Sequence, residues 1–201
     1  MTIEFIKANE ESPVVEFDYP VDDLQVLFAN YPEWGSEDNI KGLEYKELDK
    51  RLILKSNKIH NSAFSIFKQR MEESKLSLVN QFLDIDTEKR WPDIPIPIAR
   101  QINIYFALIT DLKGYKMDQH LDNRSVYAAG YLNVFDNESL TVVSSNKKTF
   151  FGKTKESQYR APGKKGRGVI WLNTENSWHW VNKVSQDRKI IMLSFQIVPW
   201  N

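Results

Sequence analysis

A histidine and an aspartate stand two positions apart in the segment 114–123, and their side chains suit a metal ion. In an extended backbone, residues i and i+2 point to the same face, so His120 and Asp122 can aim at one point. Imidazole nitrogen together with carboxylate oxygen favours a divalent iron-type metal, whereas structural zinc usually takes thiolates. The chain has no cysteine, so histidine and carboxylate are its expected metal ligands.

A second histidine further along the chain supplies a third candidate ligand. His179 lies 59 positions after His120, and in a strand it would share one face with Val181. The set His120, Asp122 and His179 would place three ligands on one side of a metal and leave three positions open for substrates. The remaining histidine, His60, has no histidine or carboxylate at ligand spacing, so we expect it to be a surface or packing residue.

A cation begins one of the last apolar runs of the chain. Arg188, nine positions after His179, starts a run that extends to Phe195. Burying such a cation is costly unless it meets an anion, and a guanidinium pairs well with a carboxylate through two parallel hydrogen bonds. This pattern points to an acidic co-substrate beside the metal. Lys189 is the alternative anchor. Arg188 and Lys189 face opposite sides of a strand, so only one of them can point into the site. We favour Arg188 for its fork geometry.

Composition and charge narrow the class of protein. The 201 residues suit one domain, and contents of 41% hydrophobic and 27% charged residues are ordinary for a soluble globular protein. Lys+Arg and Asp+Glu both number 27, so no net field favours nucleic acid or an anionic membrane. The first 13 residues lack a signal-peptide core, and no apolar run approaches membrane-spanning length. We expect a soluble, cytoplasmic protein, whose oligomeric state the sequence does not define.

The clearest helix spans residues 62 to 83, where apolar side chains recur at roughly helical spacing. The residues expected on its apolar side are Phe64, Phe67, Met71, Leu76, Leu78, Val79 and Phe82. Its polar side mixes both charge signs, so we expect the helix to pack on the protein core rather than to bind lipid.

After a proline-rich connection at residues 91–97, the pattern changes to short apolar runs separated by polar turns. The runs lie at residues 102–109, 125–134, 140–144, 168–172, 178–181 and 189–198. Such a series predicts a sandwich or barrel-like β core.

The part of the chain before the prolines is more mixed. Residues 14–17 and 51–54 look extended, and residues 22–31 can form a short helix. We therefore expect one domain, residues 1–201. In it, residues 1–99 form a mixed layer of helices and strands, and residues 100–201 form the β core with the metal site.

The pattern of His-x-Asp, a second histidine about sixty residues on and a basic residue nine beyond it resembles the iron(II)- and 2-oxoglutarate-dependent oxygenases. The local sequence is closest to the prolyl-hydroxylase branch of that family. The matching segments are Gly114-Tyr115, His120-Leu121-Asp122-Asn123, Tyr131-Leu132-Asn133 and Trp178-His179. The resemblance covers about residues 100–198.

This resemblance implies a mainly β fold, a double-stranded β-helix or jelly roll buttressed by N-terminal helices. It implies that His120, Asp122 and His179 hold Fe(II) and are the catalytic centre. The co-substrate 2-oxoglutarate would chelate the iron, while its far carboxylate pairs with Arg188 and accepts a hydrogen bond from Tyr131. The activity implied is that of a dioxygenase that uses O2 to hydroxylate a C–H bond of a protein side chain or small metabolite, with release of succinate and carbon dioxide.

Two positions depart from the pattern of that family. Ile190 stands where many members have serine or threonine, and residues 137–139 lack a frequent Gly-Gly pair. Two other functions remain open from the residues themselves. One is a jelly-roll binding protein without catalysis, and the other is a cupin-type metal-dependent enzyme that does not use 2-oxoglutarate.

Overall fold

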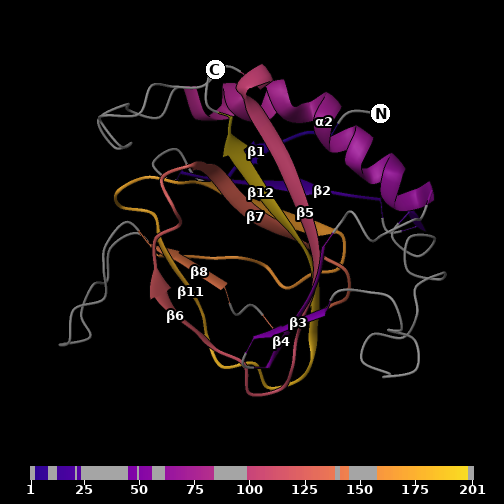
Figure 1. Cartoon of the computed structure of the whole chain (residues 1–201), viewed down its shortest axis with the longest axis vertical. Coiled ribbons are helices and arrows are strands. Elements are labelled where there is room, and N and C mark those ends of the chain that lie inside the picture. The colour runs from indigo at the N-terminus through magenta and orange to yellow at the C-terminus, as the bar shows by residue number, and fades with distance from the viewer. Residues whose placement is uncertain are drawn as a thin grey trace.

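Two facing antiparallel sheets and one long helix make up the described part of the chain (Figure 1). The computed structural model describes residues 3–8, 13–20, 22–23, 45–48, 50–55, 62–83, 99–138, 141–144 and 158–198. The larger sheet has the strand order β1 (Ile6–Lys7), β2 (Val14–Asp18), β10 (Arg167–Leu172), β7 (Val126–Asn133), β12 (Arg188–Ile197), β5 (Ile102–Asp111), β4 (Arg51–Lys55) and β3 (Tyr45–Leu48). The smaller sheet has the order β6 (Met117–His120), β11 (Trp178–Val181), β8 (Thr141–Ser144) and β9 (Gln158–Arg160). The helices with described bounds are α2 (Ser62–Leu83) and the short 3-10 helix η4 (Ala99–Gln101).

The fold is mainly β and is a double-stranded β-helix, as the sequence predicted. Each of the six predicted apolar runs after residue 100 corresponds to a strand. The short strands β3, β6 and β9 were not among the predicted runs. The predicted helix at 22–31 lies outside the described residues apart from 22–23, and the predicted connection at 91–97 lies wholly outside them.

Helix α2 covers the outer face of the larger sheet, across the top of the view in Figure 1. Its bounds are those predicted, and Phe64, Phe67 and Met71 are fully buried against the sheet. The prediction was wrong for Leu76, which is 60% exposed. Five positions after Met71 correspond to about 500° of rotation, which turns Leu76 well away from the stripe that packs on the sheet.

Strand β12 joins the two layers of the core, because its side chains alternate between faces. Ile191, Leu193 and Phe195 lie in the cluster that includes α2. Ile190 and Met192 belong to the cluster between the two sheets. The inner face of β12, on which Ile190 and Met192 lie, therefore borders the space in which a site can form.

The packing of α2 generates a stability prediction. Phe67 is fully buried and its ring contacts those of Tyr19, Phe64 and Phe106. We expect Phe67→Ala to lower the free energy of unfolding by about 3–5 kcal/mol, because it leaves a cavity in the core. The neighbouring Ile66 is 48% exposed, so Ile66→Ala should change stability by no more than about 0.5 kcal/mol. Urea unfolding of both variants measures the difference, and equal losses would contradict the described packing.

Candidate metal centre

Two neighbouring strands of the smaller sheet bring the candidate ligands together. Strands β6 and β11 pair antiparallel, and the Cα atoms of His120 and His179 are direct partners in that pairing. Asp122 follows β6 by two residues. The chain enters β6 through a turn in which Gly114 has a φ of +90°, a conformation that favours glycine. Backbone hydrogen bonds from Gly114 N to Val184 O and from Val184 N to Tyr115 O join this turn to the chain that follows β11.

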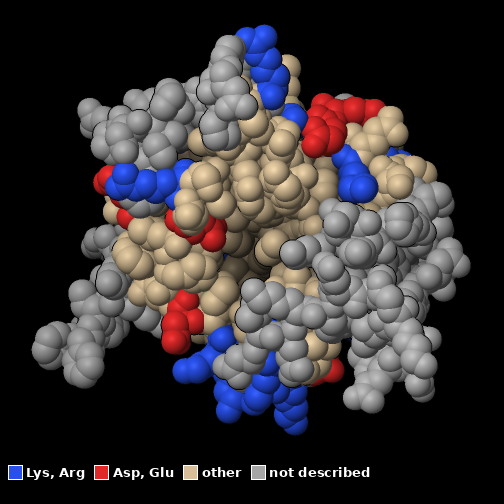
Figure 2. Space-filling view, in the orientation of Figure 1, with Lys and Arg blue, Asp and Glu red and all other residues tan. Residues whose placement is uncertain are grey.

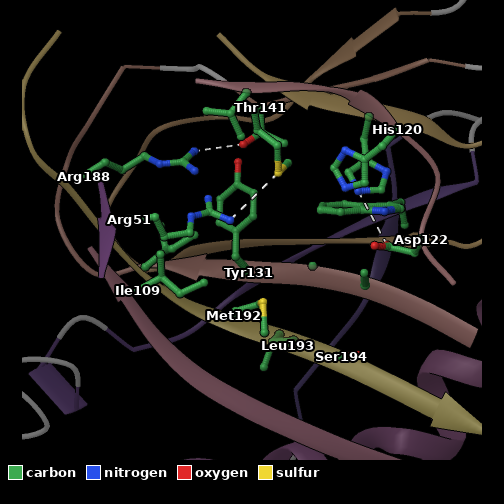
Figure 3. A pocket seen from close by; sticks show the side chains of 17 residues that line it. Arg51, Ile109, His120, Asp122, Tyr131, Thr141, Arg188, Met192, Leu193 and Ser194 are labelled. Carbon is green, nitrogen blue, oxygen red and sulfur yellow. Dashed lines mark hydrogen bonds and ion pairs between the residues drawn. The ribbon is translucent and has the colours of Figure 1, made fainter. Parts of the chain in front are cut away.

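The ligand atoms of His120, Asp122 and His179 all lie within 4.8 Å of one another. The two imidazole ring centroids are 4.2 Å apart, and His179 Nε2 lies 3.6 Å from Asp122 Oδ2 (Figure 3). The Oδ2 atom of Asp122 is buried and has no hydrogen-bond partner among the described residues. The structure thus brings together the three residues that the sequence singled out.

Hydrogen bonds to backbone carbonyls set the state of both histidines. His120 Nδ1 lies 3.0 Å from the Asp118 carbonyl oxygen, and His179 Nδ1 lies 3.1 Å from that of Ser177. A carbonyl oxygen only accepts, so each Nδ1 must carry the proton, which leaves the lone pair on Nε2. Such outer hydrogen bonds are typical of metal-bound histidines.

Burial lowers the pKa of His179 below its usual value of 6.5, with Asp122 opposing the shift and His120 adding to it. The imidazole is therefore neutral at neutral pH, which is the form that binds a metal. This ligand set of two imidazole nitrogens and one carboxylate oxygen fits a divalent transition metal with open positions. The unpartnered, buried Oδ2 of Asp122 agrees with such a metal.

A cavity of about 250 Å³ connects this cluster with a cationic region. His120, Asp122 and His179 line it at one end, and Arg188, Thr141 and Tyr131 line it elsewhere (Figure 3). Its walls between them include Ile190, Met192 and Trp171. Figure 2 shows that this face of the molecule is hollowed near its centre, and the described residues next to the hollow are mainly uncharged.

Arg188 is 2% exposed and faces the cavity, but its anion is a protein carboxylate. Its Nε and Nη2 donate to Asp111 Oδ2 at 3.0 and 2.6 Å, and its Nη1 donates to Thr141 Oγ1 at 2.9 Å. The argument that a buried Arg188 requires an acidic co-substrate is therefore weakened, because Asp111 already meets that requirement.

Lys189 points away from the cavity. Its ammonium lies 5.8 Å from the centroid of the Phe135 ring, and the residue is absent from the cavity lining. The two basic residues occupy opposite faces of β12, as the sequence predicted.

Tyr131 lies in β7 beside the guanidinium of Arg188, which is 5.4 Å from the centroid of the tyrosine ring. Burial raises the pKa of Tyr131, while Arg188 and a hydrogen bond with Thr141 act in the opposite direction. The phenol stays protonated at neutral pH and can donate a hydrogen bond to an anion in the cavity.

Sequence reasoning missed three polar residues of this region, Arg51, Asp111 and Thr141. Arg51 of β4 lines the cavity and binds the other oxygen of Asp111, with 2.5 Å between its Nε and Oδ1. The signal was present in the sequence, because Arg51 begins the apolar run 51–54 just as Arg188 begins the run that follows it. Asp111 had a signal too, since it ends the apolar strand β5.

Comparison with known proteins supports the fold. No family model matches the sequence, and no curated protein matches it. Among solved structures, a prolyl-4-hydroxylase from Pseudomonas putida has a TM-score of 0.64 at 12% identity, over 94% of each chain. HygX from Streptomyces hygroscopicus, solved with nickel and 2-oxoglutarate bound, has a TM-score of 0.57 at 8% identity, over 96% of this chain and 87% of its own.

A collagen prolyl hydroxylase from Paramecium Bursaria Chlorella virus-1, solved with 2-oxoglutarate, has a TM-score of 0.55 at 10% identity. The alignment covers 96% of this chain and 100% of the viral one. This chain therefore has the fold of structures described as prolyl hydroxylases and 2-oxoglutarate-binding proteins.

Within the described residues, no helix is both long and apolar enough to cross a membrane.

The cluster predicts metal binding that depends on His179. We expect the wild-type protein to bind Mn(II), used as an air-stable divalent probe, and His179→Ala to bind it at least about tenfold more weakly, because one ligand is lost. The matched control is His60→Ala, which removes the histidine that the sequence places in no ligand pattern. Calorimetry measures the Mn(II) affinity of each variant, and thermal unfolding checks that each variant is folded. Equal Mn(II) affinity in His179→Ala and wild type would contradict the assignment.

Proposed function

We propose that this protein is an Fe(II)- and 2-oxoglutarate-dependent dioxygenase that hydroxylates a C–H bond. The observation that carries the proposal is a single cavity that joins the group of His120, Asp122 and His179 to a buried cationic end at Arg188. The fold supports it, because neighbours at 8–12% identity are described as prolyl hydroxylases or hold 2-oxoglutarate. The substrate in this proposal is a protein side chain or a small metabolite.

Seven residues of the cavity have a role in this proposal. His120, Asp122 and His179 hold Fe(II) through Nε2 atoms and a carboxylate oxygen, and they are the catalytic residues. Arg188 and Tyr131 bind the far carboxylate of 2-oxoglutarate, the first as a cation and the second as a neutral donor. The apolar side chains of Ile190 and Met192 limit the water around the bound acid.

When bound, Fe(II) would supply the redox chemistry that couples 2-oxoglutarate and O2 to the substrate. In the overall balance, 2-oxoglutarate loses carbon dioxide and becomes succinate. One oxygen atom of O2 enters the succinate, and the other enters the new hydroxyl group. The protein contributes ligand orientation, a fixed place for the acid and an enclosed cavity.

Release of succinate tests this activity without knowledge of the substrate. We expect the wild-type protein with Fe(II), ascorbate and 2-oxoglutarate to form succinate slowly, through turnover uncoupled from hydroxylation. His179→Ala should form none above the protein-free rate, because it lacks a ligand, whereas His60→Ala should match the wild type. Succinate is measured by mass spectrometry under air and under nitrogen. Production that does not depend on oxygen or on His179 would contradict the proposal.

Metal analysis of the purified protein, together with calorimetry of 2-oxoglutarate binding, separates the other two functions. Metal binding without affinity for 2-oxoglutarate would favour a cupin-type enzyme. Binding of neither would favour a binding protein without catalysis.

The choice between the two basic residues of β12 gives a further prediction. We expect Arg188→Ala to weaken 2-oxoglutarate binding to the Mn(II)-loaded protein by about 10- to 100-fold, because a charged hydrogen bond is lost. Mn(II) affinity should stay within about twofold, since Arg188 is not a metal ligand in this assignment. Lys189→Ala is the matched control, because its side chain points away from the cavity. A loss of affinity in Lys189→Ala alone would move the assignment to that residue.

A further inference from the structure

Three charged side chains lie side by side on adjacent strands of the larger sheet. The Cα atom of Asp111 in β5 is the direct partner of Arg51 in β4 on one side and of Arg188 in β12 on the other. Residues opposite one another on paired strands project from the same face. The single carboxylate of Asp111 therefore lies between two guanidinium groups and forms an ion pair with each of them.

The contacts of Asp111 use both of its oxygens. Arg51 donates from Nε to Oδ1 at 2.5 Å and from Nη2 to Oδ2 at 3.1 Å, while Arg188 donates twice to Oδ2. The Asp111 side chain is 0% exposed, and those of Arg51 and Arg188 are 14% and 2% exposed. One negative charge thus faces two positive charges in a place with little water.

The net charge of Arg51, Asp111 and Arg188 together decides what this group of side chains can bind. Arg188 and Asp111 alone form a neutral pair, which has little attraction for an anion. With Arg51 included, the group carries one net positive charge, and a buried net charge is costly without a counterion. Both guanidinium groups line the cavity. Among the described residues no other carboxylate forms an ion pair with either arginine, so a counterion for the remaining charge is one that enters the cavity.

We infer that Arg51 is a specificity-determining residue, which makes this end of the cavity cationic and binds the far carboxylate of the 2-oxo acid together with Arg188. The inference rests on the proposed function. It names Arg51 as the residue that gives the proposed enzyme a preference for dicarboxylic 2-oxo acids. A monocarboxylic 2-oxo acid leaves the net charge at this end without a partner.

The donors available agree with this role. A guanidinium has five N–H groups, and the contacts within the described residues use three on each arginine. A carboxylate has about four acceptor positions on its two oxygens, so it can accept the donors that remain.

Arg51 is held in place for this task. Its guanidinium lies 4.4 Å from the centroid of the Tyr115 ring, and its Nη1 lies 3.9 Å from Met117 Sδ. Met117 begins β6, the strand that ends at His120. Arg51 therefore contacts both the carboxylate of Asp111 and the strand that carries a candidate ligand.

A purely structural role is the alternative, in which Arg51 only pins β4 to β5 through Asp111. Charge compensation separates the two roles. Arg51→Met leaves the neutral pair of Arg188 and Asp111, and adding Asp111→Asn restores one net positive charge without restoring Arg51. A structural role predicts that the variant at Arg51 lowers the unfolding temperature and leaves the affinity of the folded protein for 2-oxoglutarate unchanged.

The experiment measures 2-oxoglutarate binding to Mn(II)-loaded protein by calorimetry for the wild type, Arg51→Met, Asp111→Asn and the double variant. We expect Arg51→Met to bind about 10- to 100-fold more weakly, with Mn(II) affinity unchanged. The double variant should recover at least about tenfold of that loss, because its net charge matches the wild type. Arg51→Gln, which retains a donor for Asp111, replaces Arg51→Met should the latter fail to fold.

Two outcomes would overturn the inference. The first is an unchanged affinity for 2-oxoglutarate in the folded Arg51 variant, and the second is a double variant no tighter than Arg51→Met. A wild-type protein that binds Mn(II) but not 2-oxoglutarate gives a different result, because it overturns the proposed function itself. Comparison of 2-oxoglutarate with 2-oxobutyrate on the wild type adds a control, since the shorter acid lacks the second carboxylate.

Discussion

The central constraint in this protein is the burial of one carboxylate between two guanidinium groups. Asp111 accepts hydrogen bonds from Arg51 and Arg188, and its side chain is fully buried. An unpaired charge in this position would cost several kcal/mol, so the three strands β4, β5 and β12 must keep their register for the group to exist. A one-residue slip of β4 or β12 would turn its arginine to the opposite face. The ion pairs and the sheet register therefore support one another.

The two ends of the cavity belong mainly to different sheets. His120 and His179 lie on β6 and β11 of the smaller sheet, while the charged group lies on β4, β5 and β12 of the larger one. The relation between the ends is thus fixed by packing between the sheets, where Tyr131, Val143 and Ile190 share one apolar cluster. Thr141 lies in β8 of the smaller sheet, yet its hydroxyl accepts a hydrogen bond from Arg188 of the larger sheet. This contact ties the smaller sheet to the cationic end.

The sequence predicts the parts of this structure that depend on local patterns. Periodicity gave the bounds of α2, and apolar runs located β5, β7, β10 and β12, because burial of one face leaves a repeat that spacing reveals. The short strands β6 and β9 carry the polar sequences MDQH and QYR, so no apolar run marks them. Leu76 was misplaced because apolar character alone does not fix the angle around a helix.

The candidate site divides in the same way between local and distant signals. His120 and Asp122 are two residues apart, so their proximity follows from backbone geometry, whereas His179 was proposed from its residue type and was placed 59 positions away only with the support of a family resemblance in spacing. The partner of Arg188 was assigned to a co-substrate because Asp111 lies 77 positions away and only the register of β5 with β12 brings them together. No pattern within one segment reveals that pairing. A cation at the start of an apolar strand predicts an anion nearby, but not its origin.

Arg51 lies on a strand outside the central set of the sheet. Its strand β4 pairs with β5 on one side and with β3 on the other, and β3 is the last strand in the described order. The candidate metal cluster has a similar placement, because β11 pairs on both sides and β6, which carries His120, is the edge strand of the smaller sheet. Both ends of the cavity therefore depend on strands at or next to the edge of a sheet, and the register of these outer pairs places their side chains in the cavity.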